Sequence, residues 1–505
     1  MTAPWKAPDG IPIPENILQA ISSDKWWGPG FERGDFTAWR SALAAMFGLP
    51  MTEEQIAIYR EHTGRTDPPS VPAREFWCVA GRRGGKSRIM ATVAAWLACF
   101  CDWRAFLAPG QSERATIMLI AADRKQARVA MRYLRSLITQ HPLLKGLVTR
   151  EGGEVIDLSC GTSIEVATCS YRTVRGYSVA AVICDELAFW HDENAANPAT
   201  EIISALRPAM STLPGSLLMA VSSPHARRGP LWESYKRHYA KDGDPILVWQ
   251  APTRRMNPTV PQDVIDEAMD LDPARAAAEY GAQFRVDVET FISREVVDAV
   301  VVPGRHELPR VSGMQYVAFV DPSGGSSDAM TISVAHLDRA TGRAVLDAVR
   351  ERRPPFSPDQ CVNEFAGLLQ SYGIHKVTGD RYAGEWPREA FRKCGITYEP
   401  SEKTKSQIYV ELLPLLNAGR VELLDHPRLI SQLCSLERRT ARGGRDSIDH
   451  APHAHDDVAN AVAGACVLAG ARVSWFSVAG AQAAMAASNR AAMLQRHRMA
   501  ARGLY

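Results

Sequence analysis

The sequence lacks several features that would define its class at once. It has no excess of one charge, because 58 Lys and Arg residues stand against 56 Asp and Glu residues, giving a formal net charge of +2. A nucleic-acid partner is therefore neither demanded nor excluded. The sequence also has no uninterrupted apolar run of about 18 residues, the length that suggests a membrane span, so no membrane partner is expected. Residues 1–6 lack the apolar core of a signal peptide.

The ten cysteines show neither the spacing of a zinc site nor that of a disulfide framework. Cys99 and Cys101 are separated by one residue, which is too close for the usual zinc pair. We therefore expect reduced thiols in a cytoplasm. The composition, 46% hydrophobic and 23% charged, is that of a globular protein. A chain of 505 residues suggests two or three domains.

A glycine-rich segment between two apolar stretches is the first sign of chemistry. Apolar residues 76–79 precede it, and the Ala-rich segment 89–100 follows it. A β-prone run, a glycine turn, Lys-Ser and a helix form the order that a triphosphate-binding loop requires, because backbone N–H groups and the helix N-terminus bind phosphate. Lys86 is expected at the β- and γ-phosphates, and the Ser87 hydroxyl at Mg²⁺. The other expected nucleotide-binding residues of the loop are Gly81, Arg82, Arg83, Gly84 and Gly85. Ala80 stands where the pattern has glycine.

A buried-strand pattern at 179–184 ends in Asp185 and Glu186. In a nucleotidase, Asp185 would bind the Mg²⁺ water shell and Glu186 would polarise the attacking water. Strand and helix patterns alternate before this point, at 115–122, 124–138 and 161–168, which favours a parallel sheet in an α/β domain. A further buried strand at 217–224 ends in small hydroxyl residues, which suits a sensor of the γ-phosphate.

Other side chains near these motifs have a chemical and a purely structural interpretation. Arg175 is either a charge stabiliser for the transferring phosphoryl group or a surface arginine in a turn, and Arg82 is the competing charge stabiliser. Gln55 either reads an adenine edge or lies on a solvated helix face. Trp26 and Trp27 are either packed or exposed as a partner anchor, and packing is favoured because aromatic residues tend to be buried.

Prolines punctuate short helical patterns after residue 245, and we interpret residues 246–305 as a linker subdomain. A second α/β pattern then begins. An apolar strand at 316–320 ends in Asp321, a hairpin follows, and a strand at 375–379 ends in Asp380. Asp456 and Asp457 stand at the start of an Ala-rich helix.

These carboxylates would converge only around a cation, because like charges raise each other's pKa. Their hard oxygens suit Mg²⁺ or Mn²⁺, and two such ions can drive phosphodiester cleavage. Such a cluster of carboxylates around two cations is typical of ribonuclease H-like nucleases. Asp321 and Asp380 are the expected ligands with a third from the doublet, either Asp456 or Asp457.

The second pattern leaves several residues with open interpretations. His450, His453 and His455 lie close together in a proline-containing loop, which favours ordinary polar histidines over a zinc site, although one of them could assist the carboxylates. Asp328 is either a further metal group or a turn cap. Lys403 and Lys405 are candidates for DNA contact only from their place in the sequence. The basic tail, 473–505, is either an interaction segment or a frayed helix.

Taken in order, the motifs resemble those of the large subunit of the tailed-bacteriophage terminase, the DNA-packaging motor, over roughly residues 50–470. The resemblance rests on the loop 81–87, Asp185-Glu186, Ser222-Ser223-Pro224, Asp321, Asp380 and Asp456-Asp457. It implies that Glu186 is the catalytic glutamate and that Ser222-Ser223-Pro224 couples hydrolysis to movement. It also implies that Arg175 serves a neighbouring subunit's ATP, while Arg82 matches an arginine inside the loop.

The implied fold class is α/β: an N-terminal P-loop ATPase domain with a mainly parallel sheet, followed by a ribonuclease H-like α/β nuclease domain. The expected boundaries are 1–72 for a helical, adenine-side region, 73–245 for the ATPase core, 246–305 for the linker subdomain, 306–472 for the nuclease and 473–505 for the tail. The implied cofactors are ATP and Mg²⁺, with Mn²⁺ as a second choice at the nuclease site.

The implied function is ATP-driven translocation of double-stranded DNA into a procapsid, with metal-dependent endonucleolytic cutting of concatemeric DNA. The implied partners are DNA, a portal protein, a small terminase subunit and further copies of the chain in a ring on the portal. The implied place is the cytoplasm of an infected bacterium, outside the mature virion. Two alternatives are a helicase-nuclease of DNA repair and a structural assembly protein that nucleotide only regulates.

Overall fold

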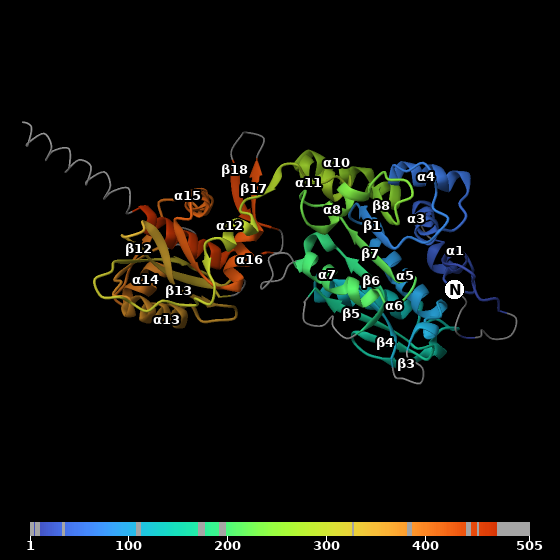
Figure 1. The fold of residues 1–505 in the computed structure, drawn as a ribbon, viewed down its shortest axis with the longest axis horizontal. Coiled ribbons are helices and arrows are strands. Elements are labelled where there is room, and N and C mark those ends of the chain that lie inside the picture. Colours follow the sequence, from blue (N-terminus) through green and yellow to red (C-terminus); the bar gives the residue numbers. More distant parts are fainter. Residues whose placement is uncertain are drawn as a thin grey trace, which may run out of the picture. The chain divides into compact units, whose positions relative to one another are not determined.

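The computed structural model describes residues 5, 11–32, 36–107, 113–169, 177–190, 198–325, 328–380, 386–440, 446–451 and 454–471. Within these ranges the chain divides into two compact units, Met1–Glu289 and Thr290–Tyr505 (Figure 1). Arg175 and His453 lie outside the described residues, so their expected functions stay predictions. No helix of the described ranges is both long enough and apolar enough to cross a membrane.

The first unit is an α/β structure built on one large sheet. Its strands are β1 (Glu75–Ala80), β2 (Ala115–Ala121), β3 (Val148–Glu151), β4 (Val155–Leu158), β5 (Thr162–Thr168), β6 (Ser178–Asp185), β7 (Leu217–Ser222) and β8 (Ile246–Ala251). Its helices are α1 (Ile17–Ala20), α2 (Gly28–Phe31), α3 (Thr37–Phe47), α4 (Glu53–Thr63), α5 (Lys86–Phe100), α6 (Arg124–Leu137), α7 (Pro198–Met210), α8 (Gly229–His238), α9 (Thr253–Met256), α10 (Gln262–Leu271) and α11 (Pro273–Glu279).

The strand order of this sheet is β3-β4-β5-β2-β6-β7-β1-β8. All pairs from β5 to β8 are parallel, whereas β3 and β4 pair antiparallel at one edge. The expected parallel sheet is therefore confirmed. β7 pairs with both β1 and β6, so Ala80, Ser222 and Asp185 end three adjacent parallel strands at one edge of the sheet.

Helices cover both faces of the sheet because the strand residues alternate between two apolar clusters. On β1, Phe76 and Cys78 pack with α5 and α6, while Trp77 and Val79 pack with α7. The short helix α1 and the buried Trp26 and Trp27 belong to the cluster on the α5 side. The expected packing of these two tryptophans is confirmed.

The interpretation of residues 246–305 as a linker subdomain is wrong for its first part. β8 lies in that segment and pairs in parallel with β1 along its whole length, from Ile246 to Ala251. β8 has only six residues and lies between Pro245 and Pro252, so the prolines that suggested a linker flank the strand and do not interrupt it. The sheet therefore extends beyond the expected boundary at 245, and α9 to α11 follow within the first unit.

The part of the chain from residue 288 onward forms a seven-stranded sheet and a separate three-stranded sheet. The strands of this part are β9 (Val288–Thr290), β10 (Val301–Val302), β11 (Tyr316–Asp321), β12 (Met330–Asp338), β13 (Arg343–Arg352), β14 (Lys376–Gly379), β15 (Thr397–Pro400), β16 (Val421–Leu424), β17 (Leu436–Thr440) and β18 (Asp446–His450). The helices are α12 (Arg294–Asp298), α13 (Pro358–Ser371), α14 (Trp386–Lys393), α15 (Lys405–Asn417) and α16 (Pro427–Ser435), and residues 457–471 are also helical.

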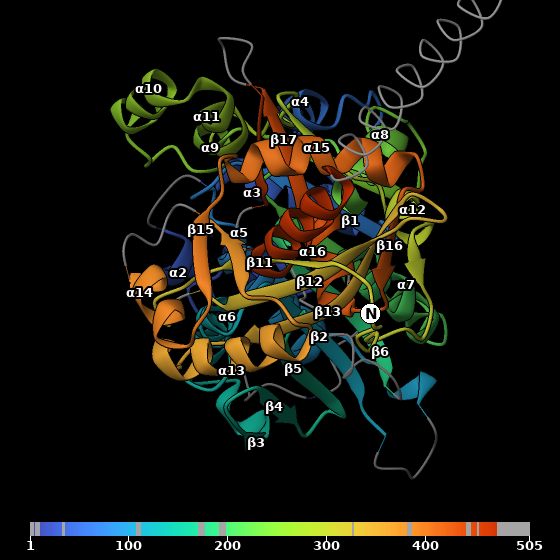
Figure 2. The ribbon, with the colours of Figure 1, turned by 90° about the vertical axis from the view of Figure 1, so that its left-hand side faces the viewer.

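In this sheet, order β10-β16-β13-β12-β11-β14-β15, the neighbours β11, β12 and β13 pair antiparallel, and β14 and β15 continue in parallel beside β11. α13 and α14 pack on one face, and α15, α16 and the helix at 457–471 pack on the other. Figure 2 shows α13 and α15 on opposite sides of these strands. The expected ribonuclease H-like α/β arrangement is confirmed, as is the overall α/β fold class.

Gly464 explains how closely the helix at 457–471 approaches the central strand β11. A Cβ atom at this position would lie 2.2 Å from Cγ of Phe319, so only a glycine permits this contact. Asp457 and Asn460, near the start of the same helix, are thereby held at the end of β11 where Asp321 lies. This close approach is the packing feature that assembles the carboxylate site of the second unit.

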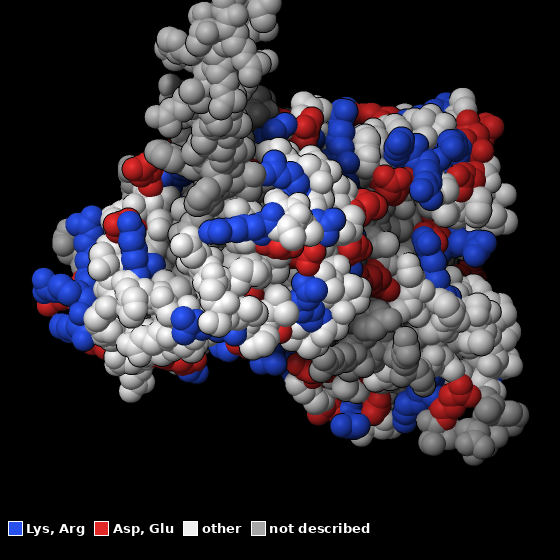
Figure 3. Space-filling model, turned by 60° about the vertical axis from the view of Figure 1, so that its left-hand side comes forward, with Lys and Arg blue, Asp and Glu red and all other residues white. Residues whose placement is uncertain are grey.

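Charges of both signs are mixed over the surface. On the face that Figure 3 shows, Lys and Arg side chains are interspersed with Asp and Glu. This agrees with the near-zero net charge of +2.

Candidate functional site

The loop between β1 and α5 has the tight backbone that the sequence predicted. Gly85 precedes α5 in the left-handed region, with φ 86°, and Arg83 has φ 65° although it is not glycine. Gly81 leaves no room for a side chain, because a Cβ atom would lie 2.2 Å from Oγ1 of Thr253. The backbone of the loop is thus fixed in the curled form that suits phosphate binding.

The support for this loop comes from the segment after β8, which the sequence analysis assigned to a linker. The Thr253 hydroxyl donates to the Arg82 carbonyl at 2.8 Å. The Asn257 amide donates to the Arg83 carbonyl, also at 2.8 Å. The Arg82 N–H in turn donates to the Glu279 carbonyl at 2.5 Å. Thr253, Asn257 and Glu279 therefore support the loop from behind, and we call these residues the wall of the loop. No local sequence pattern predicts these contacts.

Lys86 is the charged residue at the centre of the first site. It is 5% exposed, and its Nζ donates to the carbonyls of Ala80 and Gly81, each at 3.1 Å, and to Oγ of Ser223 at 2.8 Å. A carboxylate oxygen of Glu186 lies 3.2 Å away. Because all these partners are oxygens around one ammonium group, Lys86 can exchange some of them for phosphate oxygens of a nucleotide.

Asp185 and Ser87 form the expected pair for a divalent cation. The Ser87 hydroxyl lies 3.4 Å from Oδ2 of Asp185, and Oδ1 of Asp185 is buried without a hydrogen-bond partner. Burial and the neighbouring Glu186 raise the pKa of Asp185 to about 7, while Lys86 opposes this rise. A buried acceptor with a free lone pair beside a hydroxyl fits an oxygen-ligated cation such as Mg²⁺.

Glu186 is held in a strained conformation at the end of β6. Its φ is 49°, in the left-handed region, which costs free energy for a non-glycine residue. Its Oε2 accepts from the Ser223 N–H at 3.1 Å and from the Ser222 hydroxyl at 3.3 Å. The two serines that the sequence singled out therefore contact the expected catalytic glutamate directly, and link it to β7.

Two other predicted nucleotide residues have different surroundings from those expected. The guanidinium of Arg82 is 60% exposed and lies 3.3 Å from Glu279. The side chain of Gln55 accepts from the Thr52 N–H at 3.0 Å, while Thr52 caps the Gln55 N–H in a capping box that starts α4. This capping accounts for the amide oxygen of Gln55, and its adenine contact stays a prediction.

The second site lies where β11 and β14 end side by side. Asn460, from the helix at 457–471, donates one amide nitrogen to Oδ2 of Asp321 at 2.9 Å and to Oδ2 of Asp380 at 3.4 Å. Since one nitrogen reaches both carboxylates, these two predicted ligands are close neighbours. Asn460 itself was missed by the sequence analysis. The only signal was its spacing of three residues from Asp457, which places both on one helix face.

The doublet at the helix start separates into two different environments. Oδ2 of Asp457 accepts from the Ala329 N–H at 3.3 Å, and its carbonyl accepts from the Thr331 hydroxyl at 2.6 Å. Asp456 is 5% exposed and is paired with Lys405 at 3.0 Å and with the Tyr409 hydroxyl at 2.9 Å. Because Asp456 already has a cation and a phenol, Asp457 is the better candidate for the third metal ligand.

The electrostatics of the second site favour a bound cation. Burial and repulsion from Asp457, Asp456 and Asp380 raise the pKa of Asp321 well above its usual range, although the Asn460 amide lowers it. Burial and Asp456 raise the pKa of Asp457 to about 6. A divalent cation would relieve this repulsion, and carboxylate oxygens are the ligands that Mg²⁺ and Mn²⁺ prefer. Asp321 and Asp380, which share one amide nitrogen of Asn460, therefore fit such an ion. Among the described residues, Asp457 belongs to no set of three ligand side chains whose atoms lie within 4.8 Å of one another, so it would have to approach the ion.

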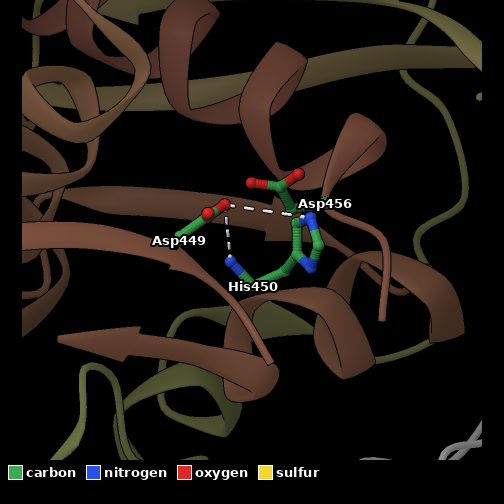
Figure 4. A group of neighbouring side chains, drawn as sticks. All are labelled: Asp449, His450 and Asp456. Atoms are coloured by element: carbon green, nitrogen blue, oxygen red, sulfur yellow. Dashed lines mark hydrogen bonds and ion pairs between the residues drawn. The ribbon is translucent and has the colours of Figure 1, made fainter. Parts of the chain in front are cut away.

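A second acidic group lies beside this site. Among the described residues, one set of three potential ligand side chains has atoms within 4.8 Å of one another: Asp449, His450 and Asp456 (Figure 4). The Lys405 ammonium lies 3.1 Å from Asp449 and 3.0 Å from Asp456. This ammonium supplies the positive charge that the group requires, so we assign no metal there. Lys405, a candidate DNA contact by sequence, is instead half-buried between carboxylates.

His455 and Asp328 lie at the outer side of Asp457. Nδ1 of His455 is 3.8 Å from Asp328, and both side chains are well exposed, by 45% and 60%. The exposed position of His455 agrees with an ordinary loop histidine. The Asp328 carbonyl accepts from the Ser323 hydroxyl at 2.7 Å, a turn contact that involves its backbone and leaves the function of its carboxylate open.

Comparison with known proteins finds no matching family model and no matching curated protein sequence. Solved structures that it resembles include large terminases of phages. The large terminase of bacteriophage HK97 is 18% identical, over 79% of this chain and 91% of that chain, with a TM-score of 0.34. A large terminase from a thermophilic bacteriophage is 11% identical, over 86% and 98%, with a TM-score of 0.37. The nuclease of the large terminase of the thermophilic phage G20c, with bound magnesium, is 20% identical, over 34% and 95%, with a TM-score of 0.30.

Proposed function

We propose that this chain is a subunit of a viral DNA-packaging motor, with an ATPase in residues 1–289 and a metal-dependent DNA endonuclease in residues 290–471. One observation carries the proposal: two separate sites, each built from buried acidic groups at the ends of adjacent strands, occur in one chain. The first has the lysine, serine and glycine loop that a nucleoside triphosphate requires. The second brings the carboxylates at the ends of two strands to the amide of Asn460, which lies one helical turn after Asp457.

In the first site, Lys86 and the loop N–H groups would bind the phosphates of ATP, and Ser87 and Asp185 would hold Mg²⁺. The cation supplies charge neutralisation at the phosphates when it is bound. Glu186 orients the attacking water and accepts its proton, for which the hydrogen bonds from Ser222 and Ser223 fix its position. The same two contacts link the state of Glu186 to β7, which gives hydrolysis a route to a conformational change.

In the second site, Asp321, Asp380 and Asp457 would hold divalent cations, which serve cleavage of the phosphodiester of DNA. Bound cations would activate a water and stabilise the leaving oxygen. The chain positions these ligands: Ala329 and Thr331 fix Asp457, and without a cation Asn460 bridges the other two carboxylates.

The proposed biological setting is the packaging of viral DNA. Double-stranded DNA is the substrate of both activities, since it is translocated into a procapsid and cut from a concatemer. A portal protein, a small terminase subunit and a ring of further copies are the proposed partners, with Arg175 or Arg82 as the charge stabiliser. The proposed place of action is the cytoplasm of an infected bacterium.

The decisive experiment measures ATP hydrolysis and plasmid cleavage in the same samples of the full chain. Lys86→Ala should reduce DNA-stimulated ATP hydrolysis by about 10²–10³-fold and leave cleavage in Mn²⁺ intact. Asp380→Asn should abolish cleavage and leave ATP hydrolysis intact.

Each other outcome has a definite meaning. If Lys86→Ala hydrolyses ATP like the wild type, the motor proposal is wrong. If the wild type cuts DNA in neither Mg²⁺ nor Mn²⁺, residues 290–471 form a binding module and the chain is an assembly ATPase. Strand separation on forked DNA would instead favour a helicase-nuclease of repair.

A further inference from the structure

Asn460 is an unusual residue for the place it occupies. Its side chain is completely buried at the start of an otherwise apolar helix, and two carboxylates lie against its amide nitrogen. Its amide oxygen, Oδ1, is also buried and has no hydrogen-bond partner. A buried amide normally satisfies both ends, because each unmade hydrogen bond costs about 1–3 kcal/mol. The buried amide oxygen without a partner therefore requires an explanation.

The amide group has two orientations of nearly equal shape and opposite polarity. Its NH₂ side donates and its oxygen side accepts. In the orientation present, the NH₂ group faces Asp321 and Asp380, and it supplies the only polar bridge between these carboxylates among the described contacts. In the reverse orientation an acceptor would face two acceptors, which is unfavourable unless a cation stands between them.

We propose that Asn460 is a metal-dependent switch in the second site: its NH₂ group bridges Asp321 and Asp380 when no cation is bound, and its Oδ1 turns toward the cation when one binds. This inference rests on the proposed nuclease function only for the identity of the site. Either orientation leaves one end of the amide in the apolar surroundings, so that cost is similar in both. The charge between the carboxylates therefore decides the orientation.

Asparagine suits position 460 better than a fourth carboxylate would, both with and without a bound cation. Without a cation, an aspartate at 460 would add a further negative charge to a group whose members already repel one another. Asparagine adds none, and it donates to the two groups that need a donor. With a cation, asparagine offers the neutral oxygen ligand that Mg²⁺ accepts beside carboxylates. The residue is thus suited to both states of the site.

The test observes the amide directly in the full chain. Protein labelled with ¹⁵N only in asparagine gives one pair of NH₂ signals for each such side chain, and Asn460→Leu identifies the pair by its loss. Mg²⁺ is added without nucleotide, and its binding is followed by calorimetry in the same buffer. We expect the Asn460 NH₂ proton signals to move to lower chemical shift, because the group loses its hydrogen bonds to the two carboxylates.

Metal affinity is the second readout. Asn460→Leu, similar in size but without an oxygen, should weaken Mg²⁺ binding by at least about tenfold. Asn417→Leu is the matched control, because Asn417 is exposed at the end of α15 and should leave binding unchanged. If the Asn460 signals stay in place at saturating Mg²⁺ while the protein cuts plasmid DNA, the switch is wrong and the nuclease stands. If the signals shift but no DNA is cut, the switch stands and the nuclease proposal fails.

Discussion

The Lys86 ammonium lies 3.2 Å from the carboxylate of Glu186, so these two residues of the proposed nucleotide site are paired with each other. Lys86 is buried, and the pair lies among carbonyl and hydroxyl oxygens rather than in water. In the proposed function, binding of a nucleotide would transfer the ammonium from Glu186 to phosphate. The same event would free the carboxylate to act as a base, so the proposal links substrate binding and activation of Glu186 in one exchange.

Glu186→Gln should therefore separate binding from hydrolysis. The amide keeps the acceptor for the Ser223 N–H but has no charge for Lys86 and no basicity for water. We expect ATP hydrolysis to fall by about 10²–10⁴-fold, with ATP affinity equal to or higher than that of the wild type, because no ion pair has to break. Turnover and equilibrium nucleotide binding measure the two effects. Glu61→Gln, a substitution in an exposed surface pair, is the control. Loss of ATP binding in Glu186→Gln would contradict this account.

The positions of the candidate acidic residues of both sites could be predicted from the sequence because their signals are local. Asp185, Asp321 and Asp380 each follow an apolar run, and a buried strand that ends in a carboxylate brings that group to a sheet edge. The contacts that position these groups could not be predicted in this way. Thr253 and Glu279 meet the phosphate loop from about 170 and 200 residues away, which no local pattern encodes. Asn460 carries no charge, and one asparagine in an Ala-rich helix gives no signal of its own.

Gly81 provides a test of the wall behind the phosphate loop. Gly81→Ala places a Cβ atom against Thr253 and the Tyr280 carbonyl, at 2.2 Å and 2.8 Å. We expect the loop to move away from its support, with a loss of about 1–3 kcal/mol in the free energy of unfolding and loss of nucleotide binding. Thermal unfolding with and without ATP measures both. Gly146→Ala, at a position with open space around it, should change neither. Normal ATP binding in Gly81→Ala would show that the wall is not required.

His62 gives a pH dependence of stability whose sign follows from its burial. The ring is 3% exposed, and its Nδ1 lies 3.1 Å from the Gln250 carbonyl. Burial lowers the pKa of His62 below its usual value and Arg255 lowers it further, while Glu61 raises it. Between the lowered pKa and about 6.5 the unfolded chain binds a proton that the folded chain does not, so stability falls as the pH falls through this window.

The slope from this one group is at most about 1.4 kcal/mol per pH unit. Thermal unfolding at pH 7.5 and pH 5.5 measures it. His62→Asn, which keeps a donor near the Gln250 carbonyl and cannot be protonated, should lose less stability than the wild type on acidification. His375→Asn, at an exposed position, should behave like the wild type. An equal loss in all three proteins would assign the pH dependence to other groups.

Gly464 tests whether helix packing assembles the carboxylate site. Gly464→Ala places a Cβ atom 2.2–2.6 Å from ring atoms of Phe319, so the helix at 457–471 must move away from β11. We expect the free energy of unfolding to fall by about 1–3 kcal/mol. Because Asp457 and Asn460 move with the helix while Asp321 stays on the strand, Mn²⁺ affinity and DNA cleavage should fall as well.

Gly367→Ala is the matched control for this substitution. Gly367 lies in α13 with open space around it, so alanine should raise stability by up to about 1 kcal/mol through its helix propensity and leave metal binding unchanged. Calorimetric Mn²⁺ titration of the two variants gives the comparison. If Gly464→Ala loses stability yet binds Mn²⁺ like the wild type, the helix supports the fold alone, and the carboxylates of β11 and β14 hold the cation without it.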